Sequence, residues 1–375
     1  MVEYVKASPC DKEEIIDFIN YVFSYSHCPH NFKAIMPKSY ADDAVDMGAI
    51  HYMTKKDGKI RAVVANRVID VSVNGRTLKF GLIGNVSVHP YSRGEGYMKE
   101  LMRMSLDDAR EIGIDIMCLG GQRQRYGYFG YENAGINLCF TVSKENIRHC
   151  FREVDASSIS FRELKEGSEE EITRIRAMYE KRPFHALRSR EEYFNIMSTW
   201  GGKCRLIYKD GTLIGYVWGG CGETVLEDEA DFPLVLKALF EKDNLKEVTI
   251  SAAPFEKERA AFLASICENS RVAMCDMVNV LNWERALDAL LGFKAQYTPL
   301  ADGEVCLDIA GEKLNITVSG GVPSVKAAPD KNADITLSHN AAEQLFFGMN
   351  SLIMPDAKLK NWIPLPFMID GPDTY

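Results

Sequence analysis

Residues 85–98 read Asn85-Val86-Ser87-Val88-His89-Pro90-Tyr91-Ser92-Arg93-Gly94-Glu95-Gly96-Tyr97-Met98. The segment opens with alternating apolar residues, which favour a strand, and passes through two glycines into a helical pattern over residues 97–112. Backbone N–H groups at a helix N-terminus attract anions, and glycines allow close approach to a phosphate. Arg93 adds a permanent cation. We therefore expect a strand, a phosphate-binding loop and a helix.

Two nucleotide-binding patterns are excluded here. The Walker spacing GxxxxGK[ST] is absent, and the dinucleotide fingerprint GxGxxG fails because position 99 is Lys. Lys99 and Arg103 lie one turn apart on the expected helix and are candidates for a further phosphate contact. The alternative is an ordinary turn in which Arg93 is solvated.

Hairpin signals precede this segment. Asp57-Gly58 and Asn74-Gly75 each separate two extended runs, and a buried strand is expected at residues 115–119. A second unit, which begins near Ser158, repeats the Asp-Gly signal at Asp210-Gly211. A third unit begins near residue 281 with a helix and short alternating strands. The pattern predicts an α/β (α+β) fold in three domains, 1–155, 156–280 and 281–375.

Composition narrows the function classes. The chain has 375 residues, a net charge of −9 and 26% charged residues, which favours a cationic partner and argues against nucleic acid. Its ten cysteines include no CxxC pair, so we expect reduced thiols and no zinc site. No long apolar segment or secretory leader is visible. We expect a cytoplasmic protein without a membrane span.

Two motifs resemble those of the GNAT acetyltransferases. Residues 93–98 resemble the Arg/Gln-x-x-Gly-x-Gly/Ala loop that binds the pyrophosphate of acetyl-CoA, with Met98 in place of Gly or Ala. Residues 126–131 resemble the Tyr-x-x-x-Gly-Phe motif, with Tyr126 as the tyrosine that points at the CoA sulfur. The resemblance implies acetyl-CoA as co-substrate and no metal.

The layout more closely resembles the enhanced intracellular survival (Eis) proteins. Those proteins have two tandem GNAT-type domains, the second degenerate, and a C-terminal domain similar to sterol carrier protein. The second unit here lacks an Arg-x-x-Gly loop, and residues 333–348 resemble the sterol-carrier segment. The resemblance implies that the C-terminal tail reaches the active site, and that the chain forms homo-oligomers, with a hexamer favoured.

Roles for individual residues follow from the same resemblance. The strand at Val86, Ser87 and Val88 would pair with the pantetheine arm, and the Val88 N–H would polarise the thioester carbonyl. The loop Arg93, Gly94, Glu95, Gly96, Tyr97 and Met98 would hold the pyrophosphate. Tyr126 would donate to the departing thiolate, and the terminal carboxylate of Tyr375 would act as general base. The alternatives are one more packed aromatic at Tyr126 and a plain surface terminus at Tyr375.

The expected reaction is direct acetyl transfer to a primary amine of a polycationic small molecule such as an aminoglycoside. Other acceptors remain open: a polyamine, a peptide or a protein lysine. A different class also remains open, a lipid-carrier module whose GNAT half only senses CoA. Intact Arg93, Gly94, Gly96 and Tyr126 argue against that inactive module.

Overall fold

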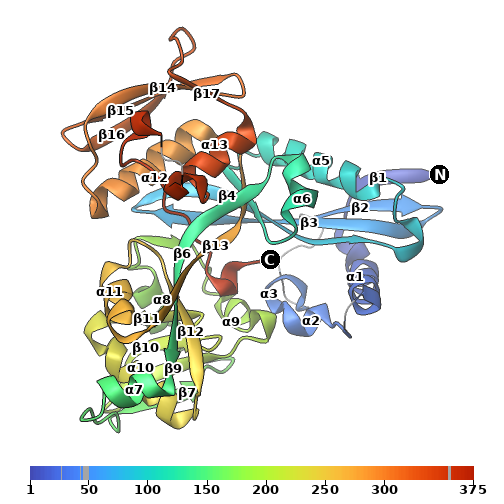
Figure 1. The fold of residues 1–375 in the computed structure, drawn as a ribbon. Coiled ribbons are helices and arrows are strands. Elements are labelled where there is room, and N and C mark those ends of the chain that lie inside the picture. Colours follow the sequence, from blue (N-terminus) through green and yellow to red (C-terminus); the bar gives the residue numbers. More distant parts are fainter. Residues whose placement is uncertain (27, 43, 45–49, 354–355) are drawn as a thin grey trace.

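The computed structural model describes residues 1–26, 28–42, 44, 50–353 and 356–375. Within these residues the strands form three sheets, and the largest has the order β1-β2-β3-β4-β5-β13-β6-β12, with β8 paired to β3 (Figure 1). Its strands are β1 (Val2–Lys6), β2 (His51–Lys56), β3 (Lys59–Val73), β4 (Arg76–Val88), β5 (Ile116–Leu119), β6 (Glu132–Ser143), β8 (Phe184–Ala186), β12 (Glu247–Ala252) and β13 (Asn269–Val280). The sheet is mixed, because β4 and β5 are parallel and the other pairings are antiparallel.

The predicted hairpins are confirmed. Asp57-Gly58 joins β2 to β3 and Asn74-Gly75 joins β3 to β4, antiparallel in both cases. All four turn residues have positive φ (51°, 75°, 50° and 80°), as a type I′ turn requires. The third signal, Asp210-Gly211, joins the second and third strands of the second sheet.

The other two sheets have four strands each. One has the order β11-β10-β9-β7 and the other β16-β15-β14-β17, in which β14 and β17 are parallel. Their strands are β7 (Ile159–Glu163), β9 (Cys204–Lys209), β10 (Thr212–Trp218), β11 (Glu223–Leu226), β14 (Gly303–Ile309), β15 (Glu312–Ser319), β16 (Val322–Ala327) and β17 (Ile335–Leu337).

Two long strands link the upper and lower parts of the molecule. β13 lies between β5 and β6 and is antiparallel to both. On its other edge, β6 pairs with β12. In Figure 1, β6 and β13 run from the large sheet down into the lower, yellow-green part. A strand from late in the chain therefore completes the sheet that the first residues begin.

The helices cover the faces of these sheets. They are α1 (Lys12–Ser26), α2 (Phe32–Ile35), α3 (Pro37–Tyr40), α5 (Tyr97–Glu111), α6 (Arg123–Tyr126), α7 (Lys144–Cys150), α8 (Glu169–Tyr179), α9 (Tyr193–Met197), α10 (Phe232–Lys242), α11 (Lys257–Ile266), α12 (Trp283–Tyr297), α13 (His339–Phe346) and α14 (Asn350–Ile353). The expected helix at 97–112 is confirmed as α5. Among the described residues, no helix has the length and apolar character needed to cross a bilayer.

Successive side chains along β3 and β4 point to opposite faces of the sheet, and each face packs in a different hydrophobic core. On one face, Ile83 packs with Leu101 and other α5 residues. On the other face, Leu82 packs with Leu290 of α12 and with the third sheet. The final segment crosses this second core, where Trp362 and Phe367 are buried. The C-terminus lies at the centre of the molecule (Figure 1).

Candidate active site

A bulge in β4 marks the site. Val63 of β3 lies opposite Ser87, but Ala65, two residues on, lies opposite Gly84, three residues back. β4 therefore carries one extra residue here, and Asn85 takes the left-handed conformation with φ 49°. Asparagine tolerates this region better than most residues, and bulges of this kind re-aim strands near active sites.

Beyond the bulge, β4 separates from its parallel neighbour. β5 pairs with β4 only from Phe80 to Leu82, so no strand in the described part of the chain pairs with residues 83–88 on that edge. The His89 N–H donates to Arg61 O on β3 at 2.8 Å. Because successive N–H groups point to opposite edges, the Val88 N–H points to the open one. This is the direction that hydrogen bonding to an extended ligand requires.

The glycine loop follows directly. Gly94 and Gly96 have φ of 87° and 82°, and a Cβ at either would meet no atom within 4 Å. Gly96 caps α5 without any side-chain hydrogen bond, which leaves first-turn N–H groups for an anion. The loop is therefore open on the side where a phosphate would approach.

A cleft of about 720 Å³ lies beside the open edge and the loop. It contains every predicted loop and strand residue except Glu95, which instead binds Lys56 (2.8 Å) and the Tyr97 hydroxyl (2.5 Å). The lining residues are Val22, Phe23, Ser26, Val86, Ser87, Val88, Ser92, Arg93, Gly94, Gly96, Tyr97, Met98, Lys99, Gln122 and Arg125. The Glu95 carboxylate thus binds Lys56 and Tyr97, and the role of this residue in the cofactor loop stays a prediction.

Charge in the cleft fits a phosphate ligand. Arg93, Lys99 and Arg125 line it, in a chain whose net charge is −9. The expected second cation, Arg103, points elsewhere and binds Glu100 and Asp107. The Ser87 hydroxyl is buried and has no hydrogen-bond partner among the described residues. These features fit the pyrophosphate and pantetheine of acetyl-CoA.

Tyr126 ends helix α6 and is buried; it is not among the residues that line the cleft, although Arg125 beside it is. Its ring packs on Gly121, where a Cβ would lie 2.6 Å from the ring. Burial raises the pKa of Tyr126, although Arg125 acts in the opposite direction. The phenol is therefore neutral at physiological pH and available as a donor. Tyr131, the partner aromatic of the motif, is fully buried against the same core.

The C-terminal residue reaches the middle of β4. The ring of Tyr375 covers Gly84, where a Cβ would lie 1.7 Å from it, so only glycine fits. The Tyr375 hydroxyl lies 2.7 Å from the Tyr40 hydroxyl, which also contacts His51 (2.9 Å) and the Asn85 amide. The last residue and the bulge thus belong to one buried network.

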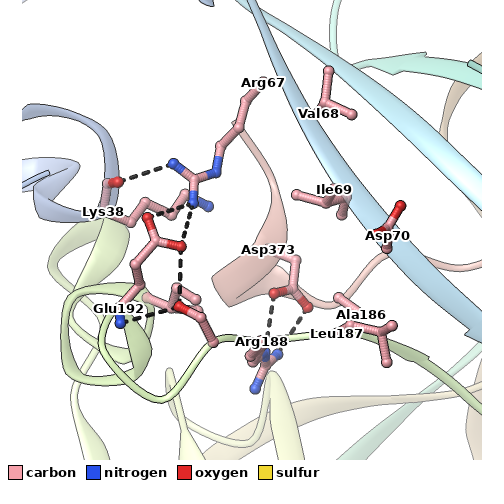
Figure 2. Close-up of a pocket in the computed structure, with 12 residues that line it drawn as sticks. Lys38, Arg67, Val68, Ile69, Asp70, Ala186, Leu187, Arg188, Glu192 and Asp373 are labelled. Carbon is pink, nitrogen blue, oxygen red and sulfur yellow. Dashed lines mark hydrogen bonds and ion pairs between the residues drawn. The ribbon is translucent and has the colours of Figure 1, made fainter. Parts of the chain in front are cut away.

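A buried lysine fastens the tail. Lys38 of α3 donates to Pro372 O at 2.7 Å and to Thr374 O, and Trp200 donates to Thr374 O at 3.4 Å. Figure 2 shows Lys38 beside Arg67, whose guanidinium binds Glu192, around a hollow of about 170 Å³. Burial lowers the pKa of Lys38 to about 7. Polar contacts therefore fix the last residues from the side of α3.

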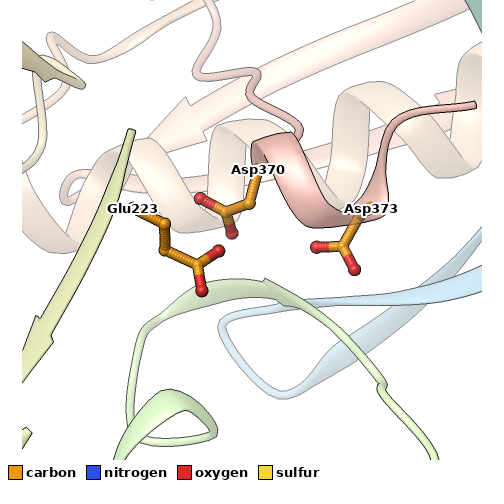
Figure 3. A group of neighbouring side chains, drawn as sticks. All are labelled: Glu223, Asp370 and Asp373. Carbon is orange, nitrogen blue, oxygen red and sulfur yellow. The ribbon is translucent and has the colours of Figure 1, made fainter. Parts of the chain in front are cut away.

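Arg188 fastens the tail from the other side. It pairs with Asp373 at 2.9 Å and with Glu223 at 2.6 Å. Asp370, Asp373 and Glu223 converge in Figure 3 closely enough to hold a metal ion. Their oxygens are taken up by Arg188, by Arg182 and by the Tyr179 hydroxyl, so this cluster is an ion-pair network that holds the tail.

Several residues of the site were not predicted from the sequence. Lys38, Tyr40, Asn85 and Arg188 carry no motif, and each acts through partners more than 30 residues away. Asn85 alone had a detectable signal, since it follows Gly84 inside a strand pattern, where such a pair suggests a bulge.

Residues 3–134 match the family model described as an acetyltransferase (GNAT) domain. The region contains the bulge, the glycine loop and Tyr126, so the chain carries a GNAT acetyltransferase domain. It is an N-acetyltransferase whose acetyl donor is acetyl-CoA. A search of curated protein sequences gives no significant match.

Solved structures share the fold of the whole chain. A probable N-acyltransferase from Enterococcus faecalis V583 is 14% identical with TM-score 0.72 and 100% coverage of both chains. A GCN5-related N-acetyltransferase from Kribbella flavida is 16% identical with TM-score 0.69, covering 100% of this chain and 98% of its own. Eis1 from Mycobacterium abscessus is 13% identical with TM-score 0.67 and 100% coverage of both chains. The predicted α/β fold class is therefore confirmed.

Proposed function

We propose that the protein moves an acetyl group directly from acetyl-CoA to a primary amine of a polycationic small molecule, such as an aminoglycoside. The observation that carries the proposal is the separation of β4 from β5, which leaves the Val88 N–H free beside a basic cleft. Bound there, acetyl-CoA would supply the activated acetyl group. The chain's own residues would orient it and handle the protons.

The binding step uses backbone and charge. Residues 86–88 would pair with the pantetheine arm as a missing strand would, while Arg93 and the open loop hold the pyrophosphate. The Val88 N–H would donate to the thioester carbonyl oxygen as negative charge develops on it. Lys99 and Arg125 would contribute to phosphate binding through charge.

Tyr126 would supply a proton, or a strong hydrogen bond, to the departing thiolate. A phenol with a pKa near 10 donating to a thiol with a pKa near 8.5 is uphill by about 2 kcal/mol. Burial raises the pKa of Tyr126 further, so full transfer is harder and donation through a hydrogen bond is favoured. This role needs the neutral phenol, which is the form present.

Tyr375 would bring the terminal carboxylate to the reacting atoms. The anchoring of Thr374 by Lys38, and of the ring on Gly84, supports this role because both fix the last residue beside the bulge. An unassisted carboxylate with a pKa near 3.5 is a weak base for an ammonium group. Desolvation of the tail would strengthen it.

The acceptor is proposed to be cationic because of the net charge of −9 and the acidic tail. A polyamine, a peptide N-terminus or a protein lysine would present the same ammonium group. We further propose that residues 281–375 form a sterol-carrier-like domain after two GNAT-like domains, 1–155 and 156–280. The parallel pairing of β14 with β17, packed against α12, supports this proposal.

The test is thiol release from acetyl-CoA with a panel of amines, which includes aminoglycosides and polyamines. We expect Tyr126→Phe to lower kcat by about 10²-fold, with little change in KM for acetyl-CoA, because the ring stays and the donor is lost. The matched control is Tyr128→Phe, since Tyr128 is 67% exposed on the next helical turn. Tyr128→Phe should retain wild-type kcat.

A chain extended beyond Tyr375 tests the terminal carboxylate. If only the Tyr126 variant fails, the acetyltransferase assignment stands and the base lies elsewhere. If no amine is acetylated while CoA binds tightly, the chain is a CoA-sensing carrier. Bound lipid in residues 281–375 would then be the next measurement.

A further inference from the structure

A second, smaller hollow follows the same open edge of β4. It has a volume of about 220 Å³ and is bounded by Ile83, Cys118, Gly120, Asp276, Thr374 and Tyr375. Ile83 precedes the strand residues of the larger cleft by three positions, and Gly120 precedes Gln122 of that cleft by two. The two hollows are therefore neighbours along β4, and the tail closes the smaller one.

Asp276 is the acidic side chain of this hollow. It lies on β13, and its Oδ1 is 3.3 Å from where a Cβ of Gly120 would stand, so the glycine leaves room beside the carboxyl. Its side chain makes no hydrogen bond or ion pair with any described residue, whereas the other tail-side acids, Asp370 and Asp373, are each held by arginine. Burial raises the pKa of Asp276 above its usual value.

Among the described residues, no neighbouring cation lowers the pKa of this carboxyl, and burial alone acts on it. Burial raises the pKa of Cys118 on β5, of Cys275 on β13 and of Tyr375 on the tail, so these three groups are neutral near pH 7. The nearby acidic side chains are already engaged: Glu132 with Arg123, Asp370 with Arg182, and Glu343 with the Val280 N–H. Tyr375, whose terminal carboxylate adds a second negative charge, also bounds the hollow.

A carboxylate that is partly desolvated and has no partner lowers the stability of the fold. Such unfavourable features are concentrated at functional sites. A primary ammonium group would supply the missing cation and three N–H donors. The hollow is bounded by Tyr375 and lies along the strand that presents the Val88 N–H. Position, size and charge thus all suit the end of an alkylammonium chain.

We propose that the hollow between β4, β5 and the tail is the acceptor pocket, and that Asp276 binds the ammonium group of the acceptor and takes its first proton. The inference rests on the proposed acetyl transfer and names the residue that selects a cationic amine. In this step R–NH3⁺ and the Asp276 carboxylate become R–NH2 and the carboxylic acid. The amine nitrogen then forms the bond to the acetyl carbon as the carbon–sulfur bond breaks. The second N–H proton leaves to the terminal carboxylate, and CoA departs as the thiolate, which accepts a hydrogen bond from the Tyr126 hydroxyl.

The experiment compares wild type, Asp276→Asn and the control Asp330→Asn. Asp330 is an exposed acid outside the site. The acceptors are kanamycin and 1,4-diaminobutane, which are cationic at pH 7, and trifluoroethylamine, which is largely neutral there. We expect Asp276→Asn to lower kcat/KM for the cationic amines by about 10²-fold. The loss should be about threefold or less for trifluoroethylamine, and it should shrink for the cationic amines as pH rises toward their own pKa.

Three further readouts separate the possible failures. Acetyl-CoA binding should be unchanged in Asp276→Asn, and the thermal midpoint of this variant should rise, because removing an unpaired and partly buried charge stabilises the fold. Equal losses for cationic and neutral amines, or none, would overturn the role of Asp276 while leaving acetyl transfer intact. Wild type that acetylates none of the three amines would overturn the proposed function itself, and this inference with it.

Discussion

Lys38 is a buried lysine in contact with carbonyl groups of the tail. Its side chain is 1% exposed and donates to Pro372 O and Thr374 O. A neutral amine has two N–H groups, which matches two carbonyl acceptors. Burial lowers the pKa of Lys38 to about 7, so the neutral form is well populated at physiological pH.

This lowered pKa predicts a pH dependence of stability. Between pH 7 and the unfolded value of 10.5, the unfolded chain binds more protons at Lys38 than the folded chain does. The free energy of unfolding must therefore rise with pH in this window, by at most about 1.4 kcal/mol per pH unit. We expect the difference between the thermal midpoints, wild type minus Lys38→Met, to increase from pH 7 to pH 9. A gap that is constant or narrows would show that Lys38 is charged in the fold.

The element that we propose to bind the phosphates is a loop whose conformation depends on glycine. Gly94 has φ 87° with no neighbour within 4 Å of a Cβ, so alanine there is strained by its backbone conformation and not by a clash. Gly113, just after α5, is in the same situation at φ 71° but lies outside the cleft. The two glycines thus differ in location, whereas the backbone strain of an alanine substitution should be similar at both.

We expect Gly94→Ala and Gly113→Ala to lose similar stability, about 1 kcal/mol each, because both force alanine into the left-handed region. Only Gly94→Ala should raise KM for acetyl-CoA, by about tenfold or more. The measurement is KM beside the thermal midpoint for both variants. An equal rise in KM for the two would mean that strain in α5, and not the loop, controls binding.

The whole molecule converges on its own C-terminus. Arg188 is 1% exposed and faces two buried carboxylates, Glu223 and Asp373. Burial works against the charged form of Asp373, but the ion pair with Arg188 holds its pKa below the usual range. The tail is therefore fastened to the second sheet by charge in a water-poor site, where breaking one partner is expensive.

Arg188→Met should destabilise the protein by about 3–5 kcal/mol, because two carboxylates would face each other without a cation. It should also expose the last residues to carboxypeptidase digestion. Arg190→Met serves as the control, since Arg190 pairs with Glu169 at the surface and should contribute about 1 kcal/mol or less. If the two variants melt alike and the tail of Arg188→Met resists digestion, the ion pairs do not hold the tail.

Prediction from sequence succeeded for segments that depend on near neighbours. The I′ turns at Asp57-Gly58 and Asn74-Gly75 and the helix after Gly96 were read correctly, because each depends on the conformational preferences of a few adjacent residues. The ion pair between Glu95 and Lys56 could not be predicted in this way, because Lys56 lies on another strand.

By itself the sequence determined the strand, the loop and the start of the helix in residues 85–98. Only the tertiary structure decided that β13 completes the first sheet, that Asp276 lies in a hollow beside the open edge, and that Tyr375 covers Gly84. The physical reason is the distance along the sequence over which each kind of interaction acts. Turn and helix preferences act over a few residues, whereas these contacts join residues more than 150 positions apart and form only when the apolar faces pack together.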